Sequence, residues 1–587
     1  MVVIGGVAAG TKAAAKAKRE NPDLEVTVLE KGEHISYAGC GLPYFVGGII
    51  KEGKDLLVRS PQDFNKDYGI VVLTHHEAYK ILTEEKVVLA RDTESGQEKA
   101  FSYDRLIIAT GAKPVVPPIP GIDLKNVFTL RKPVDALKMR SALEKAEAEQ
   151  RKLKALVVGG GLIGLEVAEN MALRGASVTV VEMLDQILPG FDLEIAKIVE
   201  NHMRDKGVNV LTDEKVNSFE GDREGFVIKA YTTKRTLDVD LVLWATGVKP
   251  DVTLAKEAGI ALGPTGAIEV DENFETNVKG IYAVGDCAQT RNLLTGNPAF
   301  YPLGSTANKM GRVAGTRAAR QSFLGTAKER SPLYVLGTGV AKIFDMAVAR
   351  TGLSEQDARK NSFDAETVLV PAHDRAHYYP GHKFIITKLV VDKPTQRLLG
   401  AQIVGEGVVD KPIDVIATAL TFGGTVGDLA AIDLAYAPPF SMALSSTIVA
   451  ANVMLNKLSG RMTGISPVDL KRRLDEEKGK PGGSASRPFM VDVRTEAEFL
   501  TGTVPGAVNI PLSDIRRLKD VVRGAASELD LPDEARKLLR LPRETELILI
   551  CRIGQRAYLA ALELKRLGFL NCKVLDGGVM SYSFGLE

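Results

Sequence analysis

The sequence predicts an α/β protein of several domains, on three observations. The chain has 587 residues, which at roughly 150 residues per domain gives about four domains. An apolar strand, a glycine-rich turn, a helix and a second strand follow one another at the N-terminus, and the same order returns near residue 155. Near the C-terminus another strand leads through a cysteine-containing loop into a helix. Strands that alternate with helices in this way form parallel sheets covered by helices.

The composition excludes several classes of partner. Lys and Arg number 75 and Asp and Glu number 74, so no basic excess favours binding to nucleic acid or to an anionic membrane. The least charged stretch, residues 412–455, is interrupted by Asp414, Asp428 and Asp433. It therefore lacks the roughly 20 apolar residues of a membrane span. We interpret it as buried core or as an interface between subunits.

Cysteine usage and the N-terminus favour a cytoplasmic protein with reduced thiols. No two cysteines form a C-x-x-C pair, so the sequence predicts neither a disulfide framework nor a structural zinc site. The N-terminus begins directly with an apolar strand and has no charged region or cleavage site of a signal peptide. The four cysteines are Cys40, Cys287, Cys551 and Cys572.

The N-terminal segment has the pattern of a dinucleotide-binding βαβ unit. The turn Gly5–Gly10 precedes a predicted helix over Thr11–Glu20, and a second strand ends in Glu30. Glycines let the backbone approach a pyrophosphate at the helix N-terminus, and the carboxylate at the strand end can hold a ribose diol. Val7 stands where the usual fingerprint has its second glycine.

A second unit repeats this pattern and keeps all three glycines, Gly159, Gly161 and Gly164. Its second strand ends in Glu182, and no arginine follows in residues 183–186. A carboxylate at this place accepts from a free 2′-hydroxyl and repels a 2′-phosphate. Two dinucleotide sites in Rossmann-like domains are therefore predicted, with NADH preferred over NADPH but NADPH still possible at the second.

Three further strands end in turns that suit the same architecture. The strands that end at Gly111 and Gly247 each precede a proline, and we expect them to be crossings between two nucleotide domains. The strand over residues 280–284 leads into Gly285 and Asp286, whose short acidic side chain can accept from a polyol hydroxyl. A Gly-Asp turn alone usually has no such role.

Together these motifs resemble the pyridine nucleotide-disulfide oxidoreductases over roughly residues 1–455. In that family the first unit and the Gly-Asp segment hold FAD, the inserted unit holds NAD(P)H, and an α+β domain forms the interface of a homodimer. The resemblance implies an FAD-binding domain over 1–112 and 248–325, an NAD(H)-binding domain over 113–247 and a dimerisation domain over 326–458. The implied FAD contacts are Gly5, Gly10, Glu30, Thr110, Gly111 and Asp286, and the implied nicotinamide nucleotide contacts are Gly159, Gly161, Gly164 and Glu182.

The segment Ser36-Tyr-Ala-Gly-Cys40-Gly-Leu-Pro-Tyr44 contains one cysteine and resembles the single-cysteine branch of this family. That branch includes coenzyme A-disulfide reductases, coenzyme A-persulfide reductases, and NADH peroxidases and oxidases. Many members have Asn where this chain has Gly39. The resemblance implies Cys40 as the redox thiol, with Ser36 near the substrate. Lys18 and Arg19 offer cations to the phosphates of coenzyme A, although their residue types favour a solvated helix face.

Two tyrosines replace the His-Pro dyad of the two-cysteine enzymes. Tyr436 lies in a Tyr-Ala-Pro-Pro segment and Tyr378 in Tyr-Tyr-Pro, as in coenzyme A-disulfide reductases, where such tyrosines stand near the thiol. A phenol can donate a proton to a leaving thiolate, and Tyr436 can act across a dimer. Three histidines surround Tyr378 without further suitable donors beyond one aspartate, so we predict no metal there and consider a phosphate-bearing ligand instead; they are His373, His377 and His382.

The tail forms a separate domain. Residues 459–486 contain a charged helix and a Gly/Ser-rich stretch that we interpret as a linker. Residues 487–587 contain Asp-Val-Arg, then Cys551-Arg-Ile-Gly-Gln-Arg556, then Leu575-Asp-Gly-Gly578. This order resembles an α/β rhodanese sulfurtransferase domain, with Thr503 in place of a common His. Convergent backbone amides and nearby arginines, Arg556 among them, favour a thiolate or persulfide on Cys551.

The sequence thus predicts an NADH-dependent FAD enzyme that reduces coenzyme A persulfide, polysulfide or coenzyme A disulfide through Cys40, while Cys551 carries sulfane sulfur. An NADH peroxidase or oxidase that cycles Cys40 through a sulfenic acid is the alternative, and it leaves the tail unexplained. A redox-sensing scaffold is a third class, which the presence of Cys551 disfavours.

Overall fold

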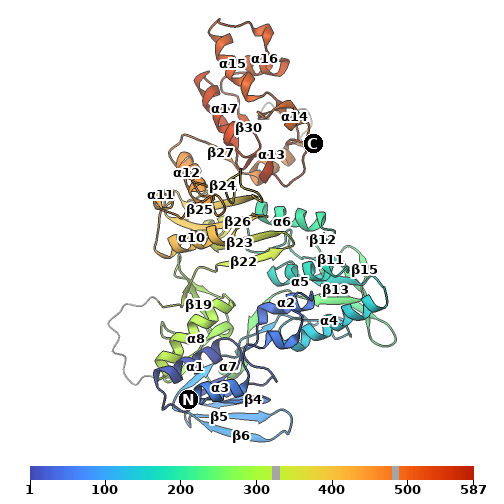
Figure 1. Ribbon diagram of the computed structural model, residues 1–587, viewed down its shortest axis with the longest axis vertical. Coiled ribbons are helices and arrows are strands. Elements are labelled where there is room, and N and C mark those ends of the chain that lie inside the picture. Colours follow the sequence, from blue (N-terminus) through green and yellow to red (C-terminus); the bar gives the residue numbers. More distant parts are fainter. Residues whose placement is uncertain (320–330, 479–487) are drawn as a thin grey trace. The chain divides into compact units, whose positions relative to one another are not determined.

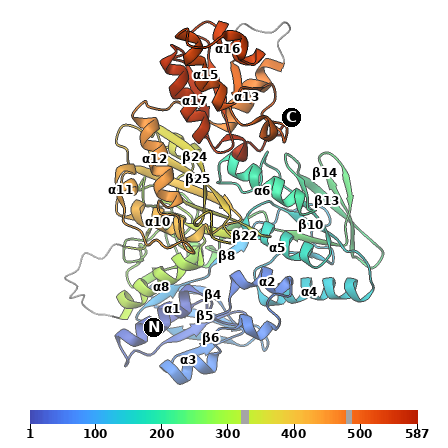
Figure 2. The same cartoon turned by 45° about the horizontal axis from the view of Figure 1, so that its top comes forward.

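The computed structural model describes residues 1–319, 331–478 and 488–587 (Figures 1 and 2). The described residues divide between two compact units, 1–185 with 207–337 and 186–206 with 338–587. Two expected domain boundaries, between residues 325 and 326 and between residues 486 and 487, lie outside the described residues.

The first unit begins with a five-stranded parallel sheet of order β18-β7-β1-β2-β3. The N-terminal βαβ unit is confirmed, with helix α1 starting at Ala9, two residues before the predicted start. The strands are short and apolar, as expected for a parallel sheet buried on both faces. Their bounds are β1 Val2–Ile4, β2 Thr27–Leu29, β3 Val71–Leu73, β7 Leu106–Ile108 and β18 Ile281–Ala283.

Small residues let two helices approach closely beside this sheet. Helix α1 (Ala9–Glu20) lies next to α8 (Gly304–Ala319) (Figure 1). A Cβ added at Gly311 would come within 2.4 Å of the Ala9 carbonyl oxygen, and one at Gly315 within 2.4 Å of the Ala13 carbonyl oxygen. The alanine-rich first helix therefore has a packing reason besides its high helix propensity.

The second βαβ unit is also confirmed, in a parallel sheet of order β12-β11-β10-β16-β9. The expected crossings pair with each other, since β8 (Ala112–Pro114) is antiparallel to β17 (Val248–Pro250). The elements of this domain are β9 Val127–Phe128, α4 Pro133–Ala148, β10 Lys154–Val158, α5 Leu162–Leu173, β11 Ser177–Val181, β12 Asn209–Leu211, β13 Val216–Gly221, β14 Val227–Thr232, β15 Thr236–Asp238 and β16 Leu241–Trp244.

Shorter elements complete the first unit. Strands β4 to β6 form an antiparallel sheet, and β19 to β21 form another small sheet. The bounds are α2 Leu42–Val46, α3 Pro61–Tyr68, β4 His76–Leu82, β5 Val87–Asp92, β6 Glu98–Ser102, α7 Thr253–Glu257, β19 Thr290–Asn292, β20 Pro298–Ala299 and β21 Tyr334–Val335.

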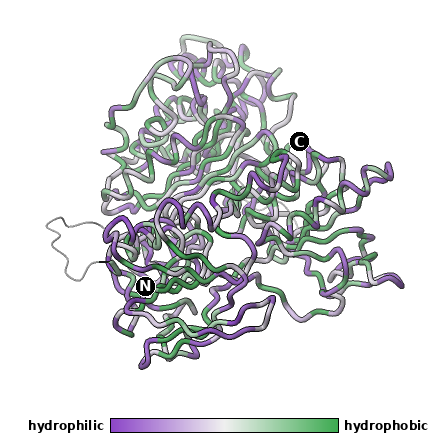
Figure 3. The backbone as a smooth tube through the Cα atoms, turned by 60° about the horizontal axis from the view of Figure 1, so that its bottom comes forward, coloured by the Kyte–Doolittle hydropathy of each residue, from purple (hydrophilic) through white to green (hydrophobic). Residues whose placement is uncertain are grey.

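The second unit contains an antiparallel sheet of order β22-β23-β26-β25-β24, with helices packed against it. Its strands are largely apolar (Figure 3), and most of their residues are buried. This is the expected α+β domain, and β24 is an edge strand. The bounds are α6 Leu193–Asp205, β22 Gly339–Ile343, β23 Met346–Gly352, α9 Glu355–Lys360, β24 Ala365–His373, β25 Phe384–Asp392, β26 Leu398–Gly405, α10 Asp410–Thr421, α11 Val426–Ala431 and α12 Ser446–Leu458.

The C-terminal domain begins earlier than expected. Strand β27 (Gly464–Ile465) pairs with β31 (Cys572–Leu575), and Leu470 and Leu474 of α13 (Pro467–Lys478) are part of the domain core. The described part of the segment predicted to be a linker thus supplies a strand and a helix, because its apolar residues are buried by the sheet. The other elements are β28 Phe489–Asp492, α14 Glu496–Phe499, β29 Val508–Asn509, α15 Leu512–Val522, α16 Asp533–Arg540, β30 Leu547–Ile550 and α17 Gln555–Arg566.

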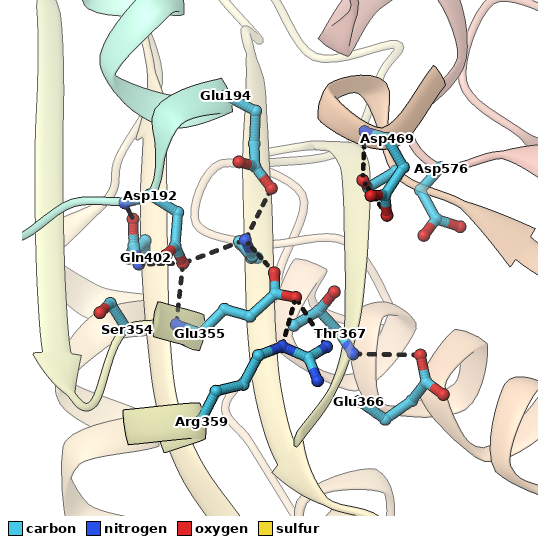
Figure 4. A network of polar contacts seen from close by, with 12 residues as sticks. Asp192, Glu194, Ser354, Glu355, Arg359, Glu366, Thr367, Gln402, Asp469 and Asp576 are labelled. Atoms are coloured by element: carbon cyan, nitrogen blue, oxygen red, sulfur yellow. Dashed lines mark hydrogen bonds and ion pairs between the residues drawn. The ribbon is translucent and has the colours of Figure 1, made fainter. Parts of the chain in front are cut away.

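A buried lysine attaches helix α6 to the antiparallel sheet. Lys388 Nζ on β25 lies 3.0 Å from Asp192, 2.6 Å from Glu194 and 2.9 Å from Glu355 (Figure 4). Burial alone lowers the pKa of Lys388, but the carboxylates outweigh it and hold the pKa above its usual value. This cluster explains why residues 186–206 belong to the second unit.

Replacing Lys388 with methionine leaves buried carboxylates without their ammonium, so we expect the free energy of unfolding to fall by about 3–5 kcal/mol. Urea unfolding measures this change. Lys383→Met is the matched control, because Lys383 pairs with Glu406 on the surface and its loss should change the urea midpoint little. Equal midpoints for the two variants would contradict the assigned role of Lys388.

Candidate active site

The first glycine turn has no room for side chains. Gly5 has a φ of +104°, and a Cβ added to it would come within 2.2 Å of the Ala109 carbonyl oxygen. A Cβ at Gly10 would lie 1.9 Å from the Gly5 carbonyl oxygen. Glycine is therefore required at both positions, and it brings the start of α1 against the end of β1.

A cavity of about 540 Å³ opens beside this turn. Glu30 at the end of β2 accepts hydrogen bonds of 2.8 Å from the backbone N–H groups of Gly6 and Gly32. Asp286 lies 3.4 Å from Arg131, and burial raises the pKa of its carboxyl despite this cation. Five of the six residues expected at FAD line the cavity, namely Gly5, Glu30, Thr110, Gly111 and Asp286, whereas Gly10 packs behind the turn.

These residues fit a dinucleotide. The turn brings backbone close to the cavity wall at a helix N-terminus, which suits a pyrophosphate. Glu30 supplies carboxylate oxygens at the distance along the chain that suits a ribose, and Asp286 supplies a second acceptor. Gly5, Glu30 and Asp286 would thus hold the phosphates and hydroxyls of FAD.

The second turn repeats the first in detail. Gly159 has a φ of +108°, and an added Cβ would come within 2.5 Å of the Ala245 carbonyl oxygen. A Cβ at Gly164 would lie 2.2 Å from the Gly159 carbonyl oxygen, whereas one at Gly161 meets nothing within 4 Å. Glu182 accepts from the backbone N–H groups of Gly160 and Leu184. Glu30 makes the equivalent bonds in the first βαβ unit, to Gly6 and Gly32. The open space at Gly161 suits a phosphate that approaches the backbone.

Cys40 lies on a loop that is tied to the first turn. Its short 3₁₀ turn, Gly39–Gly41, directly precedes α2, and its side chain is exposed. Ser36 has a left-handed φ of 47°, and its N–H donates to the Gly6 carbonyl oxygen at 2.9 Å. Tyr37, next along this loop, lines the cavity. The structure therefore brings Ser36 and the thiol loop to the turn, with the thiol accessible.

Lys18 and Arg19 do not line this cavity. The Lys18 ammonium donates to the Pro22 carbonyl oxygen at 2.5 Å, and the Arg19 guanidinium lies 5.7 Å from the centre of the Tyr68 ring. Their assignment to coenzyme A stays a prediction.

A tyrosine–glutamate contact beyond Cys40 was missed by sequence reasoning. Tyr44 on α2 donates to Glu166 on α5 at 3.4 Å, so the helix after the thiol contacts the helix after the second glycine turn. Burial raises the pKa of Glu166 to about 7, and burial together with this carboxyl raises the pKa of Tyr44 to about 12. The available signal was Glu166 itself, an acidic residue two positions after Gly164 in a mostly apolar helix.

In the second unit the structure brings the two predicted tyrosines together. The hydroxyls of Tyr378 and Tyr436 lie 3.5 Å apart, and both tyrosines are exposed. This hydrogen bond raises the pKa of Tyr378. His382 Nδ1 lies 3.0 Å from His373 Nδ1, and burial lowers the pKa of His373. Across the described residues, no group of three or more His, Cys, Asp or Glu side chains is arranged to hold a metal ion.

Cys551 occupies a closed loop at the end of β30. Its side chain is buried, and the Gly554 N–H donates to its Sγ at 3.1 Å. Gly554 has a φ of +95°, which turns the chain into α17. Such a loop of amides at a helix start favours an anionic sulfur.

Arg556 is not free to pair with Cys551 alone. Its guanidinium makes two hydrogen bonds with the Glu498 carboxylate, at 2.7 and 2.6 Å, which lower the pKa of Glu498 to about 2. Thr503, where a His is common, donates at 2.8 Å to the buried Asp492. Sequence reasoning placed Arg556 near the nucleophile but missed its carboxylate partner.

Two dinucleotide cradles, an exposed thiol tied to the first of them and a second cysteine in a closed amide loop define the class of the protein: a nucleotide-dependent oxidoreductase that uses thiol chemistry. The chain belongs to the pyridine nucleotide-disulphide oxidoreductase family, which it matches over residues 1–311, with the dimerisation domain of that family over residues 339–448. Residues 466–583 match the rhodanese-like domain. Both resemblances drawn from the motifs are thus confirmed, and the family is one of FAD- and NAD(P)H-dependent flavoproteins.

Known proteins match over most or all of the chain. The NAD(P)H coenzyme A polysulfide/persulfide reductase of Pyrococcus horikoshii is 40% identical over 455 residues, 77% of this chain and 98% of that protein. The NAD-dependent persulfide reductase from A. fulgidus is 39% identical, with a TM-score of 0.86 and 99% of both chains covered. The reduced Bacillus anthracis CoADR-RHD is 34% identical, with a TM-score of 0.86 and 99% and 97% covered. Within the described residues, no helix is both long and apolar enough to cross a membrane.

Gly10→Ala is expected to abolish FAD binding, because the added methyl would lie 1.9 Å from the Gly5 carbonyl oxygen and would force α1 away from the turn. The flavin absorbance per polypeptide of the purified protein measures this. Gly53→Ala is the control, since its Cβ meets only the Phe45 ring, at 3.7 Å. Full flavin content in Gly10→Ala would show that the turn does not form the cofactor site.

Glu166→Gln is expected to change stability in a pH-dependent way. The folded pKa of about 7 lies above the ordinary 4.5, so the protonated carboxyl stabilises the fold below about pH 4.5 and this contribution is lost as the pH rises through 7. The variant should therefore gain about 1–3 kcal/mol over the wild type at pH 8.5 relative to pH 5. Urea midpoints at both pH values measure the difference, and a pH-independent difference would contradict the assignment.

Proposed function

We propose that this protein is an NADH-dependent FAD reductase of coenzyme A persulfide, polysulfide or coenzyme A disulfide. The observation that carries the proposal is the exposed Cys40 on a loop bonded to the first dinucleotide turn, in a chain that also has Cys551 in an amide loop. The names of the Pyrococcus and A. fulgidus proteins, both persulfide reductases, support the same substrate class.

The cofactors divide between the two cradles. FAD, held by Gly5, Glu30 and Asp286, supplies the route by which an electron pair from NADH reaches the thiol. Glu182 favours NADH, because a carboxylate at this strand end repels a 2′-phosphate and exposed apolar side chains, Met183 and Leu184, follow it. NADPH is expected to be the poorer reductant.

Cys40 is the attacking group. As a thiolate it attacks the sulfur of coenzyme A persulfide that is bonded to carbon, so that a mixed disulfide between Cys40 and coenzyme A forms and hydrosulfide leaves. With coenzyme A disulfide the same attack releases one coenzyme A thiolate. Tyr378 and Tyr436, joined by their hydroxyls, are the proposed proton donors to the departing sulfur.

Cys551 is the proposed carrier of sulfane sulfur. Its thiolate takes one sulfur from polysulfide as a persulfide, and a thiol such as coenzyme A then takes that terminal sulfur. The Gly554 N–H, 3.1 Å from Sγ, stabilises the thiolate.

We further propose a cytoplasmic homodimer, supported by the match to the dimerisation domain and by exposed apolar side chains after α10, among them Phe422, Phe440 and Leu444. The rival function, an NADH peroxidase or oxidase with a sulfenic acid on Cys40, uses the same thiol and flavin. It is less favoured because a peroxidase or oxidase reaction does not use Cys551 or its domain.

The deciding experiment is anaerobic NADH consumption by the flavin-loaded protein with coenzyme A persulfide, coenzyme A disulfide or hydrogen peroxide. Persulfide as the fastest substrate, with release of sulfide, is expected. Peroxide as the fastest substrate would establish the peroxidase instead.

Cys40→Ser is expected to lower turnover with both coenzyme A substrates by at least about 10³-fold, because it removes the nucleophile, while the flavin stays bound. Cys551→Ser should keep turnover with coenzyme A disulfide and lose the turnover that depends on polysulfide. Undiminished turnover in Cys40→Ser would overturn the assignment of the redox thiol.

A further inference from the structure

Strand β24, an edge of the antiparallel sheet, is covered by the C-terminal domain. An open edge strand exposes unpaired backbone groups, and proteins usually cover or charge such edges. Here Lys457 of α12 donates from Nζ to the Thr367 carbonyl oxygen of β24 at 2.7 Å. Its ammonium also lies 3.0 Å from Glu366 and 3.1 Å from Asp576 of the C-terminal domain. Figure 4 draws Glu366, Thr367 and Asp576 as sticks.

Asp576 is buried at this contact. Its side chain is 3% exposed, and its N–H donates to the Ile465 carbonyl oxygen of β27. Burial raises the pKa of its carboxyl to about 6 despite the nearby Lys457, and the negative charges of Glu366 on β24 and Glu194 on α6 add to the rise. Lys457 is the cation that keeps this carboxylate ionised at neutral pH.

The residues after Asp576 support the loop of Cys551. A Cβ added at Gly578 would lie 2.1 Å from the Cys551 carbonyl oxygen. The Val579 N–H donates to that oxygen at 2.9 Å, and the Met580 N–H donates to the Arg552 carbonyl oxygen at 3.1 Å. Because two consecutive carbonyls are held from this segment, its position determines where the Cys551 loop lies.

The same loop reaches the end of the hairpin that carries Tyr378. The Arg552 guanidinium lies 5.2 Å from the centre of the ring of Phe384, which is the first residue of β25. The loop between β24 and β25 contains Tyr378, whose partner is Tyr436. The C-terminal domain therefore follows β24 from Thr367 to its end, and the Cys551 loop lies at the end where the tyrosines are.

We propose that Lys457 is a positioning residue that, through Asp576, fixes the C-terminal domain along β24 so that the Cys551 loop delivers its sulfur beside the Tyr378–Tyr436 pair. This inference rests on the proposed function. It replaces free movement of a tethered domain with a fixed docking geometry for the transfer step.

The transfer of sulfur from Cys551 to coenzyme A conserves atoms and electrons. The bond between Cys551 Sγ and its terminal sulfur breaks, and a new S–S bond forms to the thiolate of coenzyme A, which leaves a Cys551 thiolate and coenzyme A persulfide. No net oxidation occurs, so no further reductant is needed until the persulfide reaches Cys40.

The test compares wild type, Lys457→Met, Asp576→Asn and Lys457→Met/Asp576→Asn, all as the full chain with FAD bound. Polysulfide with catalytic coenzyme A drives NADH consumption through Cys551. Coenzyme A disulfide measures the reductase alone, and sulfur transfer from thiosulfate to cyanide measures Cys551 alone. Lys206→Met is the matched control, since Lys206 pairs with Asp345 on the surface of the same unit.

In Lys457→Met the Asp576 carboxylate is buried without its cation, so we expect polysulfide turnover at pH 8 to fall about tenfold. Reductase activity should stay within about twofold, because its groups do not contact Lys457. Sulfur transfer to cyanide should fall less than polysulfide turnover, because a small acceptor does not need the docked position of the Cys551 loop. The loss should shrink as the pH falls through 6, where Asp576 gains a proton, and the double variant should recover most activity at pH 8 and below pH 6. Lys206→Met should behave as wild type.

Hydrogen exchange of residues 576–581 tests the docking without reference to turnover. It should accelerate in Lys457→Met and return to the wild-type rate in the double variant. Unchanged exchange in Lys457→Met would overturn the docking role. Accelerated exchange with undiminished polysulfide turnover would overturn the positioning role. If the wild type shows no activity with polysulfide or with the coenzyme A substrates, the proposed function is refuted. The hydrogen exchange measurement then decides the docking role by itself.

Discussion

Close backbone approach at two glycine turns sets the geometry on which the first unit depends. At Gly5 and Gly159 the chain takes a left-handed φ with a neighbouring carbonyl too near for any Cβ. The carboxylates of Glu30 and Glu182 then bind the next N–H of each turn, which joins the end of the second strand to the start of the helix. One local solution, used twice, thus supplies both nucleotide sites and the anchor for the Cys40 loop.

The two reactive cysteines have opposite surroundings, and each suits a different step. Cys40 is exposed on a short turn, so a bulky thiol such as coenzyme A can reach it. Cys551 is buried among backbone amides, which suits a small sulfane group with negative charge. In the proposed function this difference divides the chemistry between an accessible redox thiol and an enclosed sulfur carrier, which gives a physical reason for the fusion of the two domains.

Buried ion pairs organise the second unit. Lys388 holds α6 to the sheet through three carboxylates, and Lys457 holds the C-terminal domain to the edge strand through Asp576. Burying a charge costs free energy that only a well-placed partner offsets, so each pair tolerates little displacement. These contacts are therefore better suited to fixing geometry than to adding stability.

The sequence by itself determined the two nucleotide-binding βαβ units, the single cysteine of the Cys40 loop and the Cys551 loop, because each is encoded within a short run such as Gly159–Gly164 or Cys551–Arg556. The tertiary structure alone decided which side chains pair across the chain. Tyr44 meets Glu166, Arg556 is taken up by Glu498, and Lys457 meets Asp576 over separations of 122, 58 and 119 residues. It also decided that the last domain starts at Gly464, since that strand is recognisable only by its partner β31. Periodicity and turn chemistry act over a few residues. Which side chains pair over such long separations depends instead on the packing and burial of the whole fold.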